Sequence, residues 1–127
     1  MNFIKYLVIS IALGSMAMVS STAFAGEDAG AKVRAAGEGT IVKIEEAITA
    51  LEKGGDKDAA LNPLKEARQL QKEFRYEVTE RQRQKGNNQL KAAREALDAG
   101  QMPAAEAALK EALAIFKEMK TIYDAAH

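Results

Sequence analysis

Two stretches of the chain, ALEKGGDKDAALNPLKEA (Ala50–Ala67) and ALDAGQMPAAEAALKEA (Ala96–Ala112), share one order of residues. Each runs Ala-Leu, an acidic residue, a glycine, a short polar segment with a proline, and then Leu-Lys-Glu-Ala. With Gly54 aligned on Gly100, the copies recur about every 46 residues. Each copy predicts a helix, a glycine turn and a second helix, because glycine suits the left-handed position at a helix end. Two hairpins that bury each other's apolar faces predict an all-α fold, an antiparallel four-helix bundle built from two similar helical hairpins.

The composition supports helices and narrows the classes of function. Strong helix formers such as Ala, Leu, Glu and Lys dominate the chain. It has no cysteine, which excludes a disulfide framework, a thiolate metal site and thioether-attached haem. The 18 basic and 18 acidic residues balance. Without a basic excess, we expect no nucleic-acid partner.

The first residues have the pattern of a secretory signal peptide. Lys5 precedes an apolar run from Tyr6 to Val19, and Ala23-Phe24-Ala25 fits the small-X-small rule for cleavage. The run is shorter than the ~20 residues that a spanning helix needs, although an uncleaved membrane anchor is the alternative. We expect residues 1–25 to be removed and residues 26–127 to form a helical-bundle domain. That domain would be periplasmic or secreted, with no membrane contact after cleavage.

The first predicted hairpin covers about residues 40–85. Its first helix begins near Thr40 as N-cap or frays back toward Ala31, and it ends at Gly54-Gly55. Its apolar stripe is Ile41, Ile44, Ile48 and Leu51. The second helix starts at Pro63 with Asn62 as N-cap, or else as a longer kinked helix from Asp56, at about even odds. Its inward residues are Leu61, Leu64, Ala67, Leu70 or Gln71, Phe74 and Val78.

The predicted boundary between the hairpins lies at a basic cluster. We expect the second helix to end at Lys85-Gly86, because Arg81, Arg83 and Lys85 would then oppose the negative end of the helix dipole. Asn87-Asn88 then forms a turn and N-cap for the second hairpin, about residues 88–126.

The second predicted hairpin holds a short third helix and a longer fourth one. The third helix ends at Gly100, and the fourth begins at Pro103 with the most regular stripe in the chain. That stripe consists of Ala105, Leu109, Ala112, Phe116, Met119 and Tyr123. The predicted core is Ile44, Ile48, Leu51, Leu64, Phe74, Leu90, Leu97, Leu109, Phe116 and Met119.

The two-hairpin plan and the turn phrase Ala-Leu-Glu-Lys-Gly-Gly (Ala50–Gly55) resemble the small metal-binding protein family, SmbP-like. The resemblance covers roughly Ile41 to Met119. It implies a periplasmic four-helix bundle of duplicated hairpins that binds copper and other divalent metals. The metal ligands of that family are histidines that recur along the helices. At such positions this chain holds Lys43, Glu66, Arg94 and Glu111, and its one histidine is His127.

The last helix also resembles that of the periplasmic b-type cytochromes, which are four-helix bundles. Those proteins hold haem between an N-terminal methionine and a histidine beside a tyrosine in the last helix. Here Asp124 follows Tyr123, and no methionine lies between Ala25 and Gln101. We therefore expect no haem.

Two groups of side chains have candidate chemistry. Glu66, Glu73, Glu77 and Glu80 would follow one face of the second helix, where we expect a solvated charged surface. Asp124 and His127 are three residues apart, so a helix reaching the end of the chain would bring an imidazole near a carboxylate. That pair, with the terminal carboxylate as a further ligand, predicts a weak copper or zinc site.

The catalytic patterns of common enzymes are missing. The threonines have no nearby His or Lys arrangement that would activate a hydroxyl, and the glycines form no phosphate-binding pattern. We expect a non-enzymatic protein that binds a divalent metal weakly. The alternative is a periplasmic protein–protein interaction or accessory module without metal, its partner unknown.

Overall fold

Four α-helices make up most of the computed structural model, which describes residues 28–127. They are α2 (Asp28–Glu52), α3 (Lys57–Leu70), α4 (Glu80–Asp98) and α5 (Met102–Ala126). Two short 3₁₀ turns, Gln71–Glu73 and Glu77–Thr79, lie between α3 and α4. No strand occurs among the described residues, so the predicted all-α class is confirmed. The predicted signal peptide, residues 1–25, lies outside the described part.

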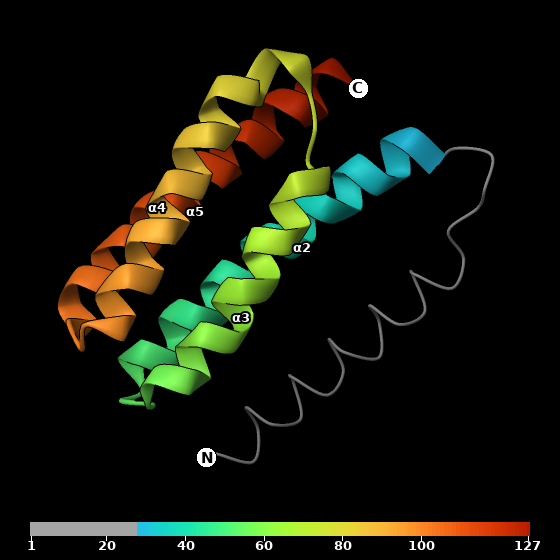
Figure 1. Ribbon diagram of the computed structural model, residues 1–127. Coiled ribbons are helices and arrows are strands. Elements are labelled where there is room, and N and C mark those ends of the chain that lie inside the picture. The colour runs from blue at the N-terminus through green and yellow to red at the C-terminus, as the bar shows by residue number, and fades with distance from the viewer. Residues whose placement is uncertain (1–27) are drawn as a thin grey trace. The chain divides into compact units, whose positions relative to one another are not determined.

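The helices come in two pairs, each joined by a glycine turn. In Figure 1, α2 lies beside α3 and α4 beside α5, and the two turns are at the same end. Contacts divide the chain into Met1–Ala31 and Lys32–His127, and everything described below belongs to the second unit.

The predicted repeat extends to individual hydrogen bonds. The amide of Gly54 donates to the carbonyl of Leu51 at 3.0 Å, and the amide of Gly100 donates to that of Leu97 at 3.0 Å. The next amide in each copy reaches back five residues, to Ala50 or Ala96, at 2.8 Å. Gly54 and Gly100 have φ angles of 75° and 76°, a left-handed conformation that only glycine adopts at little cost. The predicted glycine turns are therefore confirmed.

The start of α2 differs from the predicted N-cap at Thr40. Thr40 is buried inside the helix, and its hydroxyl donates to the carbonyl of Ala36 at 2.7 Å. The glycines upstream, which suggested fraying, have neighbours that need them. A Cβ on Gly37 would lie 2.9 Å from the Phe74 ring, and one on Gly39 would lie 3.0 Å from Leu70. These glycines let the end of α3 and the segment after it approach α2 closely.

Of the two starts predicted for the second helix, the longer one is correct. Asp56 is the N-cap of α3, since its carboxylate accepts from the amide of Ala59 at 2.9 Å. Pro63 lies inside α3 and is buried. It removes one helical hydrogen bond, a cost that the burial of its ring partly offsets.

The predicted helix boundary at Lys85-Gly86 was wrong, as was the turn at Asn87-Asn88. The break comes earlier, from Gln71 to Thr79, and α4 runs through Gly86 without interruption. Gly86 lies against the Phe116 ring on α5, because a Cβ on Gly86 would lie 2.6 Å from that ring. Here glycine permits close helix packing instead of ending a helix. Arg81, Arg83 and Lys85 consequently lie in the first turns of α4, where the helix dipole does not favour cations.

The core follows the predicted stripes. All six residues of the predicted stripe on α5 are buried. Every predicted core residue is buried except Leu51, which is partly buried and packs against the core. Val78 was predicted to face inward, but it lies in the connection before α4 and is 66% exposed. Gln71 is buried and Leu70 is partly exposed, which decides between the two inward positions left open there.

Ion pairs link α2 to α5 along their length. Glu38, Glu45 and Glu52 on α2 pair with Lys120, Lys117 and Lys110 on α5, at 3.6, 3.5 and 3.7 Å. The partner numbers fall along α5 as they rise along α2. All of these side chains are partly or largely exposed, so solvent screens each pair and each contributes little to stability.

Candidate functional site

His127, the first of the two residues predicted to bind metal, lies against two tyrosines at the end of α5. Its ring stacks on Tyr123, with centroids 4.0 Å apart, and Tyr76 meets it edge-on at 5.1 Å. Its Nδ1 is 2.8 Å from the carbonyl oxygen of Tyr123. A carbonyl oxygen only accepts hydrogen bonds, so Nδ1 carries the proton and Nε2 keeps its lone pair when the imidazole is neutral.

Asp124, the second predicted ligand, has other partners. Its carboxylate accepts a hydrogen bond from Lys120 Nζ at 2.6 Å and lies 3.8 Å from Arg34 Nε. That hydrogen bond, opposed by partial burial, raises the pKa of Lys120. Asp124 and His127 are thus near in sequence but engaged with different groups. Asp124 would have to leave these cations before it bound a metal.

The four glutamates predicted on one face do not share a helix. Glu66 is on α3, Glu73 and Glu77 lie in the connection between α3 and α4, and Glu80 begins α4. Glu80 instead pairs with Arg83 and Arg75. The hydrogen bond from Arg83 lowers the pKa of Glu80, although partial burial opposes the shift. Within residues 28–127, no three His, Cys, Asp or Glu side chains are grouped so that they could hold a metal together.

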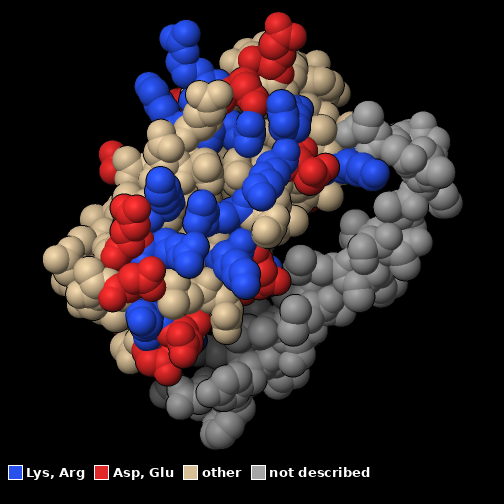
Figure 2. Space-filling model, viewed as in Figure 1, with Lys and Arg blue, Asp and Glu red and all other residues tan. Residues whose placement is uncertain are grey.

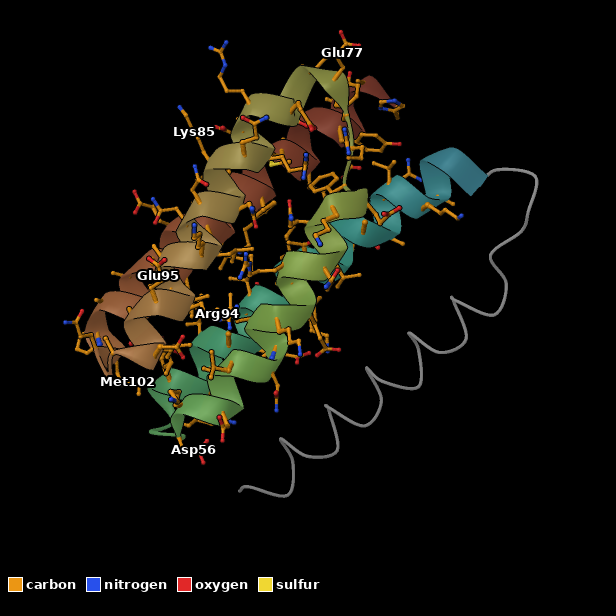
Figure 3. The ribbon with its side chains drawn as sticks, in the orientation of Figure 1. Asp56, Glu77, Lys85, Arg94, Glu95 and Met102 are labelled. Carbon is orange, nitrogen blue, oxygen red and sulfur yellow. The ribbon has the colours of Figure 1, made fainter. Side chains whose placement is uncertain are left out.

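A cleft between α3 and α4 has no counterpart among the predicted sites. It encloses about 460 Å³, and Lys65, Arg68, Lys72 and Arg94 contribute four cations to its walls. Figure 2 shows Lys and Arg side chains gathered on this face between the two helices. In Figure 3, Arg94 extends from α4 toward α3, whereas Lys85 points away.

The sequence contained one signal for this cleft. Asn87 and Asn88, which were predicted to form a turn and N-cap after a helix end at Lys85-Gly86, are poor helix formers. In the structure both lie inside α4, and Asn87 lines the cleft. A residue with low propensity for the element that contains it often has a functional role.

Comparison of the chain with protein-family models, with curated proteins and with solved structures found no match. In the described part of the chain, no helix has the length and apolar character needed to cross a bilayer.

Proposed function

We propose that the protein is a non-enzymatic binding protein of the periplasm or extracellular space that binds a divalent metal, with copper the leading candidate, weakly through His127. The observation that carries the proposal is the hydrogen-bonding distance between Nδ1 and the Tyr123 carbonyl. In metal-bound histidines, the second ring nitrogen commonly donates an N–H hydrogen bond to a carbonyl or carboxylate. This bond fixes the ring and directs the other nitrogen to the metal. The imidazole is also exposed, so a hydrated ion has access to Nε2.

We further propose that the four helices form an antiparallel bundle of two similar hairpins. Two observations support this arrangement. The α2–α5 ion pairs run in opposite directions along the two helices. The two glycine turns have the same hydrogen bonds. The resemblance to small metal-binding proteins agrees with both this architecture and a metal ligand.

Weak affinity follows from the donor set. One imidazole supplies one nitrogen, whereas tight copper or zinc sites use three or four protein ligands. Asp124 adds a carboxylate only by leaving Lys120 and Arg34, so its contribution is smaller than that of His127. Protons compete with the metal for the imidazole, and binding therefore weakens in acid.

Isothermal titration with copper(II) tests the proposal. His127→Ala should weaken binding at least about tenfold, and Asp124→Ala by a few-fold. Glu106→Ala is the control, because it removes a carboxylate from a comparable i,i+4 pair on the same helix, with Lys110 at 2.9 Å. That variant should leave the isotherm unchanged.

Two results would reject this function. Equal isotherms for the wild type and the His127→Ala variant would remove the C-terminal end from any role in metal binding. No heat with copper, zinc or nickel would favour the alternative, a periplasmic interaction module, and capture of partners from periplasmic extract would then be the next experiment.

A further inference from the structure

The cleft between α3 and α4 has the size of a small-molecule site. Its volume of about 460 Å³ is within the range of about 300–1,000 Å³ that ligand pockets occupy. One wall comes from α3 and the beginning of the following turn, and the other comes from α4. It is remote in sequence from His127 and uses different helices, so it is independent of the metal proposal.

The walls carry more positive than negative charge. Four cationic side chains line the cleft, against the two carboxylates of Asp58 and Asp98. Asp98 is already paired with Arg94 at 3.8 Å. Lys65 and Arg68 lie on one face of α3, three residues apart, and Lys72 follows four residues later in the 3₁₀ turn after it. Among the described residues, no ion pair neutralises any of these three, so this wall of the cleft can attract an anion.

Two residues that line the cleft each have one buried polar atom with no hydrogen-bond partner in the described part of the chain. The atoms are Nε of Arg68, a donor, and Oδ1 of Asn87, an acceptor. One comes from each wall. An unpaired buried polar atom costs about 1–3 kcal/mol, and most native proteins satisfy such atoms with protein groups, water or a ligand.

Gln71, which lines the same cleft, provides a useful contrast. Its amide oxygen accepts from Arg83 at 2.8 Å, and its amide nitrogen donates to the carbonyl of Arg68 at 3.0 Å. Gln71 therefore has a structural role at the end of α3. Among the described lining residues, the buried polar atoms that lack a partner are those of Arg68 and Asn87, beside two lysines without an ion pair.

We propose that the cleft binds a small oxyanion, a carboxylate or a phosphate, on the guanidinium of Arg68 between Lys65 and Lys72. The planar guanidinium matches the two oxygens of either group. Asn87 Oδ1 accepts a hydrogen bond from an N–H or O–H elsewhere on the ligand. A ligand with an oxyanion at one end and a hydroxyl or amine at the other would bind Arg68 on one wall and Asn87 on the other.

NMR titration of the ¹⁵N-labelled protein tests this site, with inorganic phosphate and citrate as the two probes. Sodium chloride at matched ionic strength serves as the reference. The expected result is a saturable set of shifts in the amides of residues 61–72 and 87–94 with at least one probe. Saturation with phosphate alone identifies a phosphate ligand, and saturation with citrate alone identifies a carboxylate.

Matched variants separate a built site from general charge attraction. Arg68→Gln should weaken binding of the probe at least about tenfold, because it removes a charge-assisted, bidentate contact. Arg81→Gln removes the same charge from an exposed position of α4 outside the cleft and should change affinity less than twofold. Arg68→Lys should recover only part of the loss, since it restores charge without the planar fork.

The α4 wall has its own pair of variants. Asn87→Ala should weaken citrate, which carries a hydroxyl, about threefold or more, whereas Asn88→Ala on the exposed side should not. Circular dichroism checks that each variant is folded, and the Asn87 and Arg68→Lys variants keep the test valid if Arg68→Gln unfolds. Shifts that fail to saturate with either probe, or equal losses in Arg68→Gln and Arg81→Gln, would overturn the proposal.

Discussion

The two glycine turns of the molecule are alike, but the helices that follow them are different. Residues 49–55 and 95–101 make the same three backbone hydrogen bonds at the same distances. After the first turn comes α3, of 14 residues, with an aspartate cap and an internal proline. After the second comes α5, of 25 residues, with no side-chain cap and a continuous buried stripe.

The difference shows that the turn and the following helix have separate roles in the duplicated sequence. The turn determines where the chain reverses. It depends on one glycine and on backbone hydrogen bonds, which form whatever the neighbouring side chains are. The following helix is free to change. In the second pair α5 supplies core contacts along its whole length, whereas α3 is shorter and, with the turn that follows it, contributes three unpaired cations to the cleft.

The largest expected effect on stability comes from a phenylalanine ring. In each helix pair, one such ring packs against a glycine of the first helix. Phe116 packs on Gly86 of α4, and Phe74 packs on Gly37 of α2. Phe116→Ala should lower the free energy of unfolding by about 3–5 kcal/mol, because the ring is fully buried and α5 cannot collapse around the gap. Urea unfolding followed by circular dichroism measures the loss.

Phe74→Ala should cost less, about 3 kcal/mol, since Phe74 lies in an irregular connection that can shift into the space. A loss below ~1 kcal/mol for Phe116→Ala would contradict the packing of α5 on α4. A larger loss for Phe74→Ala than for Phe116→Ala would show that the first pair contributes more to the core.

The turn glycines should give intermediate and equal effects. Gly54→Ala and Gly100→Ala should each cost about 1–2 kcal/mol, because alanine is strained at a positive φ. A Cβ at either position meets nothing within 4 Å, so only the backbone term differs from wild type. Thermal unfolding of both variants measures it. Asparagine, which tolerates this conformation better, should recover part of the loss. Costs that differ by more than ~1 kcal/mol would mean that the turns are not equivalent.

The smallest effect should come from the caps, where the two copies differ. Asp56→Ala should cost about 1 kcal/mol, since it removes the acceptor for the amide of Ala59. Gln101→Ala should stay within about 0.5 kcal/mol of wild type, because Gln101 makes no side-chain cap bond. Urea midpoints of the two variants give the comparison. A loss of similar size in both would show that the α5 start is also capped by its side chain.

The elements that could be predicted are those determined by local rules. All six α5 positions predicted from the apolar spacing are buried, with only the buried Ala108 missed, and the glycines at 54 and 100 correctly predicted both turns. The errors came from glycines whose role is tertiary. Nothing near Gly86 in sequence reveals that the Phe116 ring, thirty residues later, needs the space of its missing side chain. The same holds for Gly37 and Phe74.

The candidate sites also include features that could be predicted from the sequence and features that could not. The closeness of His127 to the end of α5 follows from helix length alone and could be predicted. The partners of Asp124 could not, because Arg34 comes from a helix ninety residues earlier. The cleft could not be predicted either, because its walls come from two helices. Nothing in the sequence distinguishes Arg68 and Asn87 until α3 and α4 are placed side by side.

The contact of Tyr76 with Tyr123 has a spectroscopic consequence. The chain has no tryptophan and three tyrosines, of which Tyr6 lies in the predicted signal peptide. Tyr76 and Tyr123 meet edge-on with centroids 5.4 Å apart, and His127 stacks on the second ring. The intrinsic fluorescence of the cleaved chain therefore originates at one place, where the α3–α4 connection meets the end of α5. Emission that changes at lower denaturant than helicity would mark local opening of that end before the helices unfold.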